Sequence, residues 1–221
     1  MTSGAHPLSV GAMSGGRRRI VVLRHGRTAW NVERRFQGRT DVPLDDVGTE
    51  QAHAAGERLG RLDPTVVVSS DATRAAQTAE ALAKHAGVPP VLDPRLREAD
   101  IGSWEGLTRE EVQGRFPEEY HRWRLGHDVR RGGGETYADV ARWALPAIEA
   151  ALEHLPGGHT LVTVTHGGTA RAVVGHLLGL PTTAWRSLGS LAHGRWAVLE
   201  ETVFGWRLDE HNVRPRRTPK G

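Results

Sequence analysis

The sequence predicts an α/β protein, a three-layer α/β/α sandwich whose central sheet is mostly parallel. Short apolar runs at residues 20–23, 66–68 and 160–165 are typical of buried strands. A segment with helical spacing follows each run, and such intervening helices join parallel strands. The length of 221 residues fits one domain with its own core.

The helices are predicted from apolar spacing and from residues that cap helix ends. They are expected over residues 49–62, 73–85, 108–111, about 136–154 and 167–178. Asp45 or Asp46 can cap the first helix, Asp71 the second, and Thr108 with Glu111 matches a capping box for the third. Residues 195–203 and 205–209 are expected to close the sheet as a hairpin or as edge strands.

The basic charge of the chain is concentrated at its two ends. The pI is about 9.9 and the net charge +3, yet seven of the 29 basic residues lie in segments 1–19 and 211–221, which contain no acid. These segments are predicted to be disordered tails around a domain spanning residues 20–210. The domain then carries 22 basic residues against 26 acids, so a specific nucleic-acid partner is not expected.

Composition argues against several other classes of protein. The chain has no cysteine, which excludes disulfides and thiolate metal sites and fits a cytoplasmic location. No run approaches the roughly 18 apolar residues of a membrane span, so no membrane partner is expected. No pair of histidines flanks a glutamate at helical spacing, and no metal site is predicted.

Chemically active residues follow three of the predicted strands. Arg24 and His25 follow the first, Ser69-Ser70-Asp71 leads from the second to Arg74, and His166 follows the third. Ligands of open α/β sheets bind beyond the carboxyl ends of the strands, so these groups can converge. Guanidinium forks match phosphate oxygens, and histidine offers a nucleophile near neutral pH. The sequence therefore predicts a site for phosphoryl transfer.

Four ordered motifs resemble those of the histidine phosphatase superfamily, in its phosphoglycerate mutase-like branch. They are Leu23-Arg24-His25-Gly26-Arg27-Thr28-Ala29-Trp30-Asn31, Ser69-Ser70-Asp71-Ala72-Thr73-Arg74, Leu96-Arg97-Glu98-Ala99-Asp100-Ile101-Gly102-Ser103-Trp104-Glu105-Gly106 and Val164-Thr165-His166-Gly167-Gly168. The similarity covers approximately residues 20–203. It implies the phosphoglycerate mutase-like fold, no cofactor and a possible homodimer.

The resemblance also implies roles for individual residues. His25 would be the nucleophile that forms a phosphohistidine, and Glu98 would protonate the leaving group and then activate water. Three groups would surround the phosphoryl oxygens: Arg24, Arg74 and His166. Further substrate contacts are expected from Asn31, Gln37, Gly38 and the amide of Gly167. Asp100 and Glu105 are nearby acids that could replace Glu98.

The choice within the superfamily rests on the segment after Glu98. Mutases carry a long insertion there with a basic cluster and a proline-rich run, whereas residues 107–134 are short and lack that run. This favours a phosphatase acting on a small phosphomonoester, a sugar phosphate or a phosphoglycerate derivative. The run from Leu96 to Gly106 is similar to actinobacterial phosphatases that act on glucosyl-3-phosphoglycerate. The alternatives are a cofactor-dependent phosphoglycerate mutase and a non-catalytic phosphate-binding relative.

Two features leave the substrate side of the site open. Arg122, Arg124, Arg130 and Arg131 either hold a second anionic group of the substrate or form a solvated face. His193 stands where the family commonly has Asn, and it either replaces that contact or points away. Trp104 and Trp123 are candidates for the border of the substrate pocket.

Overall fold

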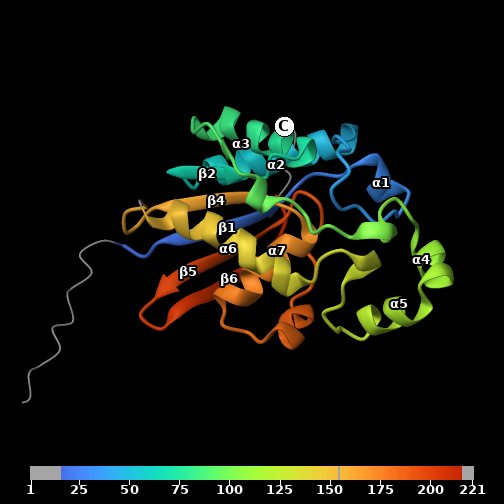
Figure 1. Cartoon of the computed structure of the whole chain (residues 1–221). Coiled ribbons are helices and arrows are strands. Elements are labelled where there is room, and N and C mark those ends of the chain that lie inside the picture. The colour runs from blue at the N-terminus through green and yellow to red at the C-terminus, as the bar shows by residue number, and fades with distance from the viewer. Residues whose placement is uncertain (1–15, 154, 216–221) are drawn as a thin grey trace, which may run out of the picture.

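The computed structural model describes residues 16–153 and 155–215, which fold around one six-stranded sheet (Figure 1). The sheet has the strand order β3-β2-β4-β1-β5-β6. The four parallel strands are β1 (Arg19–Arg24), β2 (Val66–Ser69), β3 (Val91–Leu92) and β4 (Thr160–Thr165). The hairpin of β5 (Trp196–Thr202) and β6 (Gly205–Val213) adds two antiparallel strands. The predicted mostly parallel sheet is confirmed.

Helices cover both faces of the sheet. Figure 1 shows α2 (Asp46–Gly60) and α3 (Thr73–Ala86) on one face, and α6 (Tyr137–Glu153) and α7 (Gly167–Leu177) on the other. The short helices α1 (Ala29–Val32), α4 (Arg109–Arg115) and α5 (Pro117–Arg124) lie beyond the carboxyl ends of the parallel strands. Among the described residues, no helix combines the length and apolarity needed to cross a membrane.

Strand β1 shows why the protein has three layers. Its four central residues are fully buried, and alternate side chains point to opposite faces of the sheet. Ile20 and Val22 pack with residues of α6 and α7, whereas Val21 and Leu23 pack with residues of α2 and α3. A strand that is apolar on both faces therefore requires a helical layer on each side.

The predicted domain boundaries need correction at both ends. Arg19 belongs to β1, and residues 211–213 belong to β6 rather than to a tail. Arg18 binds Glu201 at 2.5 Å and donates to the carbonyl of Leu152 at 3.0 Å. Pairing with β5 orders these residues although their composition resembles that of a tail. Residues 1–15 and 216–221 of the predicted tails lie outside the described part of the chain.

Capping explains where the helices begin. Asp45 accepts from the amide of Gly48 to start α2, and the capping box of Thr108 and Glu111 starts α4, as predicted. The prediction for Asp71 is wrong, because Ala72 is the N-cap of α3. Asp41, from a distant loop, accepts from the Thr73 amide at 2.8 Å instead.

Candidate active site

The parallel register brings the three strand ends together. Arg24 on β1 is paired with Thr165 on β4, and Ser69 on β2 with Val164 on β4. The residues that follow therefore lie at one edge of the sheet. The ring centroids of His25 and His166 are 5.1 Å apart, and both side chains are buried.

The hydrogen bonds of His25 determine which ring nitrogen is free to react. Its Nδ1 lies 2.6 Å from the carbonyl oxygen of Gly26. A carbonyl can only accept, so Nδ1 carries the proton and Nε2 keeps its lone pair. Burial, followed by the influence of His166 and of the nearby arginines, holds the pKa of His25 well below its ordinary value of 6.5. His25 is therefore neutral at neutral pH, with the unprotonated ring nitrogen that a nucleophile needs.

Close backbone packing holds the turn that carries His25. The amide of Gly26 donates to Thr78 Oγ1 at 3.1 Å. A Cβ at Gly26 would lie 2.3 Å from the carbonyl oxygen of Gly48, and one at Gly48 would lie 2.0 Å from that of Arg27. Only glycine allows the first turn of α2 to approach the His25 loop this closely.

Arg24 is anchored beside His25 and contacts His193. Its guanidinium donates to the carbonyl of Leu191 at 2.7 Å and to Nε2 of His193 at 2.8 Å. Burial lowers the pKa of Arg24 to about 10, so it remains cationic at neutral pH. Burial, together with the Arg24 charge, lowers the pKa of His193 to about 3. His193 thus faces the site as a neutral acceptor. Of the two orientations that the sequence allowed, it has the one toward the site.

Arg74 and His166 form a hydrogen-bonded pair beside His25. Arg74 Nε donates to His166 Nδ1 at 3.2 Å, and the rest of its guanidinium binds the carbonyls of Thr40 and Gly38. Since His166 Nδ1 accepts, its Nε2 carries the proton toward Ser70 Oγ, 2.8 Å away. Burial and the charges of Arg74 and Arg24 hold the pKa of His166 well below 6.5. Ser70 and Thr78 are site residues to which sequence reasoning assigned no role.

Glu98 lies at the N-terminus of α7, next to the two arginines. Its side chain accepts from the amides of Gly168 at 2.8 Å and Ala99 at 2.9 Å, and it is 9% exposed. Burial lowers the pKa values of Arg24 and Arg74, and the nearby negative charge of Glu98 partly offsets that lowering. A Cβ at Gly168 would lie 2.4 Å from Glu98 Oε1, so glycine is needed there.

The other two acids near Glu98 stabilise loops. Asp100 Oδ1 accepts from the amide of Gly102 at 2.7 Å. Glu105 Oε1 accepts from the amides of Gly38 and Thr40. Of the three carboxylates considered, Glu98 is the one whose charge acts on both Arg24 and Arg74 and that binds the first turn of α7.

The four further contact residues differ in what they offer to a ligand. Asn31 closes the capping box of α1 with Thr28, and its amide donates to Gln37 Oε1 at 3.4 Å. The amide nitrogen of Gln37 is buried and has no partner among the described residues, so it can serve as a donor. The amide of Gly38 is engaged by Glu105, whereas Gly167 lies directly against the Arg24 guanidinium.

A pocket of about 140 Å³ opens beside the catalytic groups. It reaches Arg74 and Glu98, and Arg39 and Arg97 also line it. Trp104 does not border it, because this side chain is fully buried against Phe36 and Trp123. The expectation that Trp104 borders the substrate is therefore wrong, since its indole is part of the core between α4 and α5.

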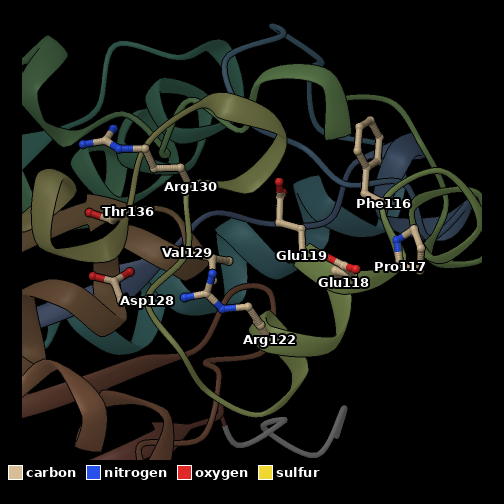
Figure 2. A pocket seen from close by; sticks show the side chains of 9 residues that line it. All are labelled: Phe116, Pro117, Glu118, Glu119, Arg122, Asp128, Val129, Arg130 and Thr136. Atoms are coloured by element: carbon tan, nitrogen blue, oxygen red, sulfur yellow. The ribbon is translucent and has the colours of Figure 1, made fainter.

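Figure 2 shows a second, larger pocket of about 760 Å³ between α5 and the start of α6. None of the candidate catalytic residues lines it. Arg122 and Arg130 lie at different sides of this pocket, and the guanidinium of Arg130 points away from Arg122 (Figure 2). Asp128, also in its wall, accepts from the amides of Tyr137 and Ala138. Arg122, Arg124 and Arg130 are exposed, whereas Arg131 is buried.

The site combines two neutral imidazoles between two guanidiniums, with a carboxylate beside them. In an α/β fold, this set of groups defines a phosphate-binding site. Within the described residues, no group of three or more His, Cys, Asp or Glu side chains is arranged to hold a metal ion. A sequence model of the histidine phosphatase superfamily (branch 1) matches residues 20–214, and the chain belongs to this family. It is a phosphatase, a phosphomonoester hydrolase, as predicted.

Several relatives carry informative names. A glucosyl-3-phosphoglycerate phosphatase of Mycolicibacterium vanbaalenii is 40% identical over 213 residues, covering 89% of this chain and 95% of the relative. A probable phosphoglycerate mutase of Yersinia pestis is 36% identical, covering 76% of this chain and 79% of the relative. The structure of a mycobacterial glucosyl-3-phosphoglycerate phosphatase complexed with VO3 has a TM-score of 0.83 at 37% identity, covering 89% and 99% of the two chains.

Proposed function

We propose that this phosphatase hydrolyses glucosyl-3-phosphoglycerate, or a closely related phosphoglycerate ester, through a phosphohistidine on His25. The observation that carries the mechanism is the bond from His25 Nδ1 to the Gly26 carbonyl, because it leaves Nε2 unprotonated toward the site. The names of the relatives at 37–40% identity support the substrate.

The first step transfers the phosphoryl group to the enzyme. Nε2 of His25 forms a bond to phosphorus while the bond from phosphorus to the ester oxygen breaks. Arg24 and Arg74 neutralise the charge on the transferring group, and Glu98 gives a proton to the departing alkoxide. His166, held by Arg74 and Ser70, lies beside His25 to contact the phosphoryl oxygens.

The second step returns the enzyme to its starting state. The Glu98 carboxylate takes a proton from a water molecule, whose oxygen attacks phosphorus. The bond from phosphorus to Nε2 breaks, which releases inorganic phosphate and restores neutral His25. Glu98 is then protonated again for the next cycle.

A panel of phosphomonoesters tests the substrate. Glucosyl-3-phosphoglycerate is expected to have a higher kcat/KM than simple sugar phosphates and p-nitrophenyl phosphate. If no phosphoglycerate ester is hydrolysed better than p-nitrophenyl phosphate, the substrate proposal is wrong. A phosphoglycerate mutase assay run on the same enzyme distinguishes the alternative that the Yersinia relative's name suggests.

The nucleophile is tested separately from the substrate. His25→Ala should abolish turnover and also the acid-labile phosphoenzyme that rapid quenching with labelled substrate would trap in the native enzyme. Retention of either by the variant would contradict a covalent role for His25. Binding of inorganic phosphate to the variant shows that the pocket is still folded.

A further inference from the structure

Two arginines contact the ring of Tyr137, the first residue of α6. Arg131 lies over the ring with its guanidinium carbon 4.4 Å from the ring centroid. Arg171, on α7, lies 5.8 Å from the same centroid and donates to the Tyr137 hydroxyl at 3.5 Å. Arg131 lies on the 3-10 helix Arg131–Gly133, which precedes α6, and it is 40 residues from Arg171 in the sequence, so the fold brings the two side chains to the same ring.

Neither arginine forms an ion pair with a described carboxylate. None of the ion pairs formed within residues 16–153 and 155–215 includes Arg131 or Arg171. Arg131 is only 6% exposed, and its Nε and Nη2 are buried without a hydrogen-bond partner. Arg171 Nε is buried and unpaired in the same way. Buried guanidinium donors without acceptors are costly, which indicates a position kept for an anion.

A third cation adds to the positive field at this position. Arg186, on the 3-10 helix Thr182–Ser187, stacks on Trp123 at 4.9 Å from the ring centroid. Burial lowers the pKa of Arg186, and the charges of Arg171 and Arg124 lower it further. Like-charged groups that influence one another in this way favour the binding of an anion between them.

The arginine pair is next to the reacting groups, on the side of Glu98. A Cβ at Gly168 would lie 2.4 Å from Glu98 Oε1 and 3.1 Å from Tyr137 Cε1, so one glycine separates the acid from the ring. Ser190 accepts from Arg171, and the next residue, Leu191, accepts from Arg24. Because Glu98 protonates the leaving oxygen, groups beyond Glu98 face the leaving alcohol rather than the phosphoryl group.

We infer that Arg131 and Arg171 form a carboxylate site for the leaving group, so that the preferred substrates are phosphomonoesters whose alcohol carries a carboxylate. This inference rests on the proposed function and names the residues that would bind the second anionic group of the substrate, its carboxylate. Two planar guanidinium forks suit a carboxylate, and their desolvation strengthens the contact. The sequence offered four arginines either as substrate contacts or as a solvated face. Of these, Arg131 takes the substrate role, while Arg122, Arg124 and Arg130 are at the surface.

The kinetic test compares two esters that differ only in the group to be recognised. These are 3-phosphoglycerate and glycerol 3-phosphate, the second of which has a hydroxymethyl group in place of the carboxylate. The native enzyme is expected to prefer 3-phosphoglycerate in kcat/KM by about tenfold or more. Arg131→Gln and Arg171→Gln should each reduce that preference by about fivefold or more. Arg122→Gln removes the same charge from an exposed position and should leave the preference unchanged.

A binding measurement keeps the inference testable without turnover. Calorimetry on His25→Ala should show tighter binding of 3-phosphoglycerate than of glycerol 3-phosphate, and adding Arg131→Gln should remove the difference. Equal binding of the two esters, or an equal effect of Arg122→Gln, would overturn the carboxylate site. If aryl and glycerol esters are hydrolysed without any carboxylate preference, only the carboxylate site is wrong. If no ester is hydrolysed and no phosphoenzyme forms, the proposed function fails, and calorimetry still decides the site.

Discussion

At the scale of single residues, burial sets the charge state of the site. His25, His166 and His193 are all held neutral by desolvation and by the neighbouring arginines. Arg24 keeps its charge because even its lowered pKa of about 10 lies well above neutral pH. At one pH, neutral imidazoles can provide a nucleophile while cationic guanidiniums stabilise negative charge on phosphoryl oxygens.

The buried histidines predict how stability depends on pH. Their pKa values are lower in the folded protein than the ordinary 6.5, so the unfolded chain binds protons first as the pH falls. Their contribution to stability is therefore present above pH 6.5 and is lost below it, by at most about 1.4 kcal/mol per pH unit for each histidine.

Denaturant unfolding between pH 7.5 and 5.5 measures this loss. His193→Asn keeps an acceptor for Arg24 but does not titrate, so its free energy of unfolding should fall less steeply with acidification. His176→Asn, at an exposed position on α7, is the control and should keep the native slope. Identical slopes for the native protein and both variants would contradict the assignment of His193 as a half-buried neutral side chain.

The position of Glu98 predicts a dependence on the leaving group. Glu98→Gln should lower kcat by about 10²–10⁴-fold for alkyl phosphates, whose leaving oxygen needs a proton. The loss should be much smaller for p-nitrophenyl phosphate, since nitrophenolate leaves without one. Asp100→Asn, which alters a loop contact to Gly102, should affect both substrates equally. Equal losses on both substrates for Glu98→Gln would point to another acid.

At the scale of elements, the site depends on how helix starts meet strand ends. The first turn of α2 touches the loop after β1 through Gly26 and Gly48. The first turn of α7 holds Glu98 through the Gly168 amide. The start of α3 places Arg74, and Asp41 from a distant loop accepts from the Thr73 amide in its first turn. Each of these candidate catalytic side chains is thus placed by two elements, which explains why glycines recur at these contacts.

Replacing Gly48 by alanine tests the contact between α2 and the nucleophile loop. The new Cβ would lie 2.0 Å from the carbonyl oxygen of Arg27, so the backbone must move. We expect a loss of about 2–3 kcal/mol in the free energy of unfolding and a clear fall in kcat. Gly114→Ala is a matched control, because nothing lies within 4 Å of its Cβ position on α4. It should be neutral or stabilising by up to about 1 kcal/mol, and denaturant unfolding of both variants checks this.

At the scale of the whole molecule, strand order determines which loops meet. The central position of β4 between β2 and β1 places His166 between Arg74 and His25. A phosphate bound there contacts loops that follow three strands, so binding couples these strands to one another.

Phosphate binding should therefore stabilise the fold. At about one hundred times its Kd, inorganic phosphate adds about 2.7 kcal/mol. For a domain of this size that raises Tm by about 5–10 °C. Arg74→Gln should reduce the increase, whereas Arg122→Gln at the surface should retain it. Thermal unfolding with and without phosphate measures the difference, and an equal increase in both variants would place the anion elsewhere.

Most of the sheet was predictable because buried parallel strands and capped helices are local patterns. The predicted strand at residues 160–165 coincides with β4, and the hairpin was found within a few residues. The two-residue strand β3 carries too short a pattern to be recognised. Asp71 was misassigned as a cap because its actual contact, with Arg97, joins positions 26 residues apart.

The sequence by itself determined the fold class, the family and the set of candidate site residues, because periodicity and motifs are properties of short segments. Only the tertiary structure decided which ring nitrogen of His25 is unprotonated, the orientation of His193 toward Arg24 and the burial of Arg131 against Tyr137. These features depend on desolvation and on contacts between distant segments. Neither quantity exists before the chain is folded.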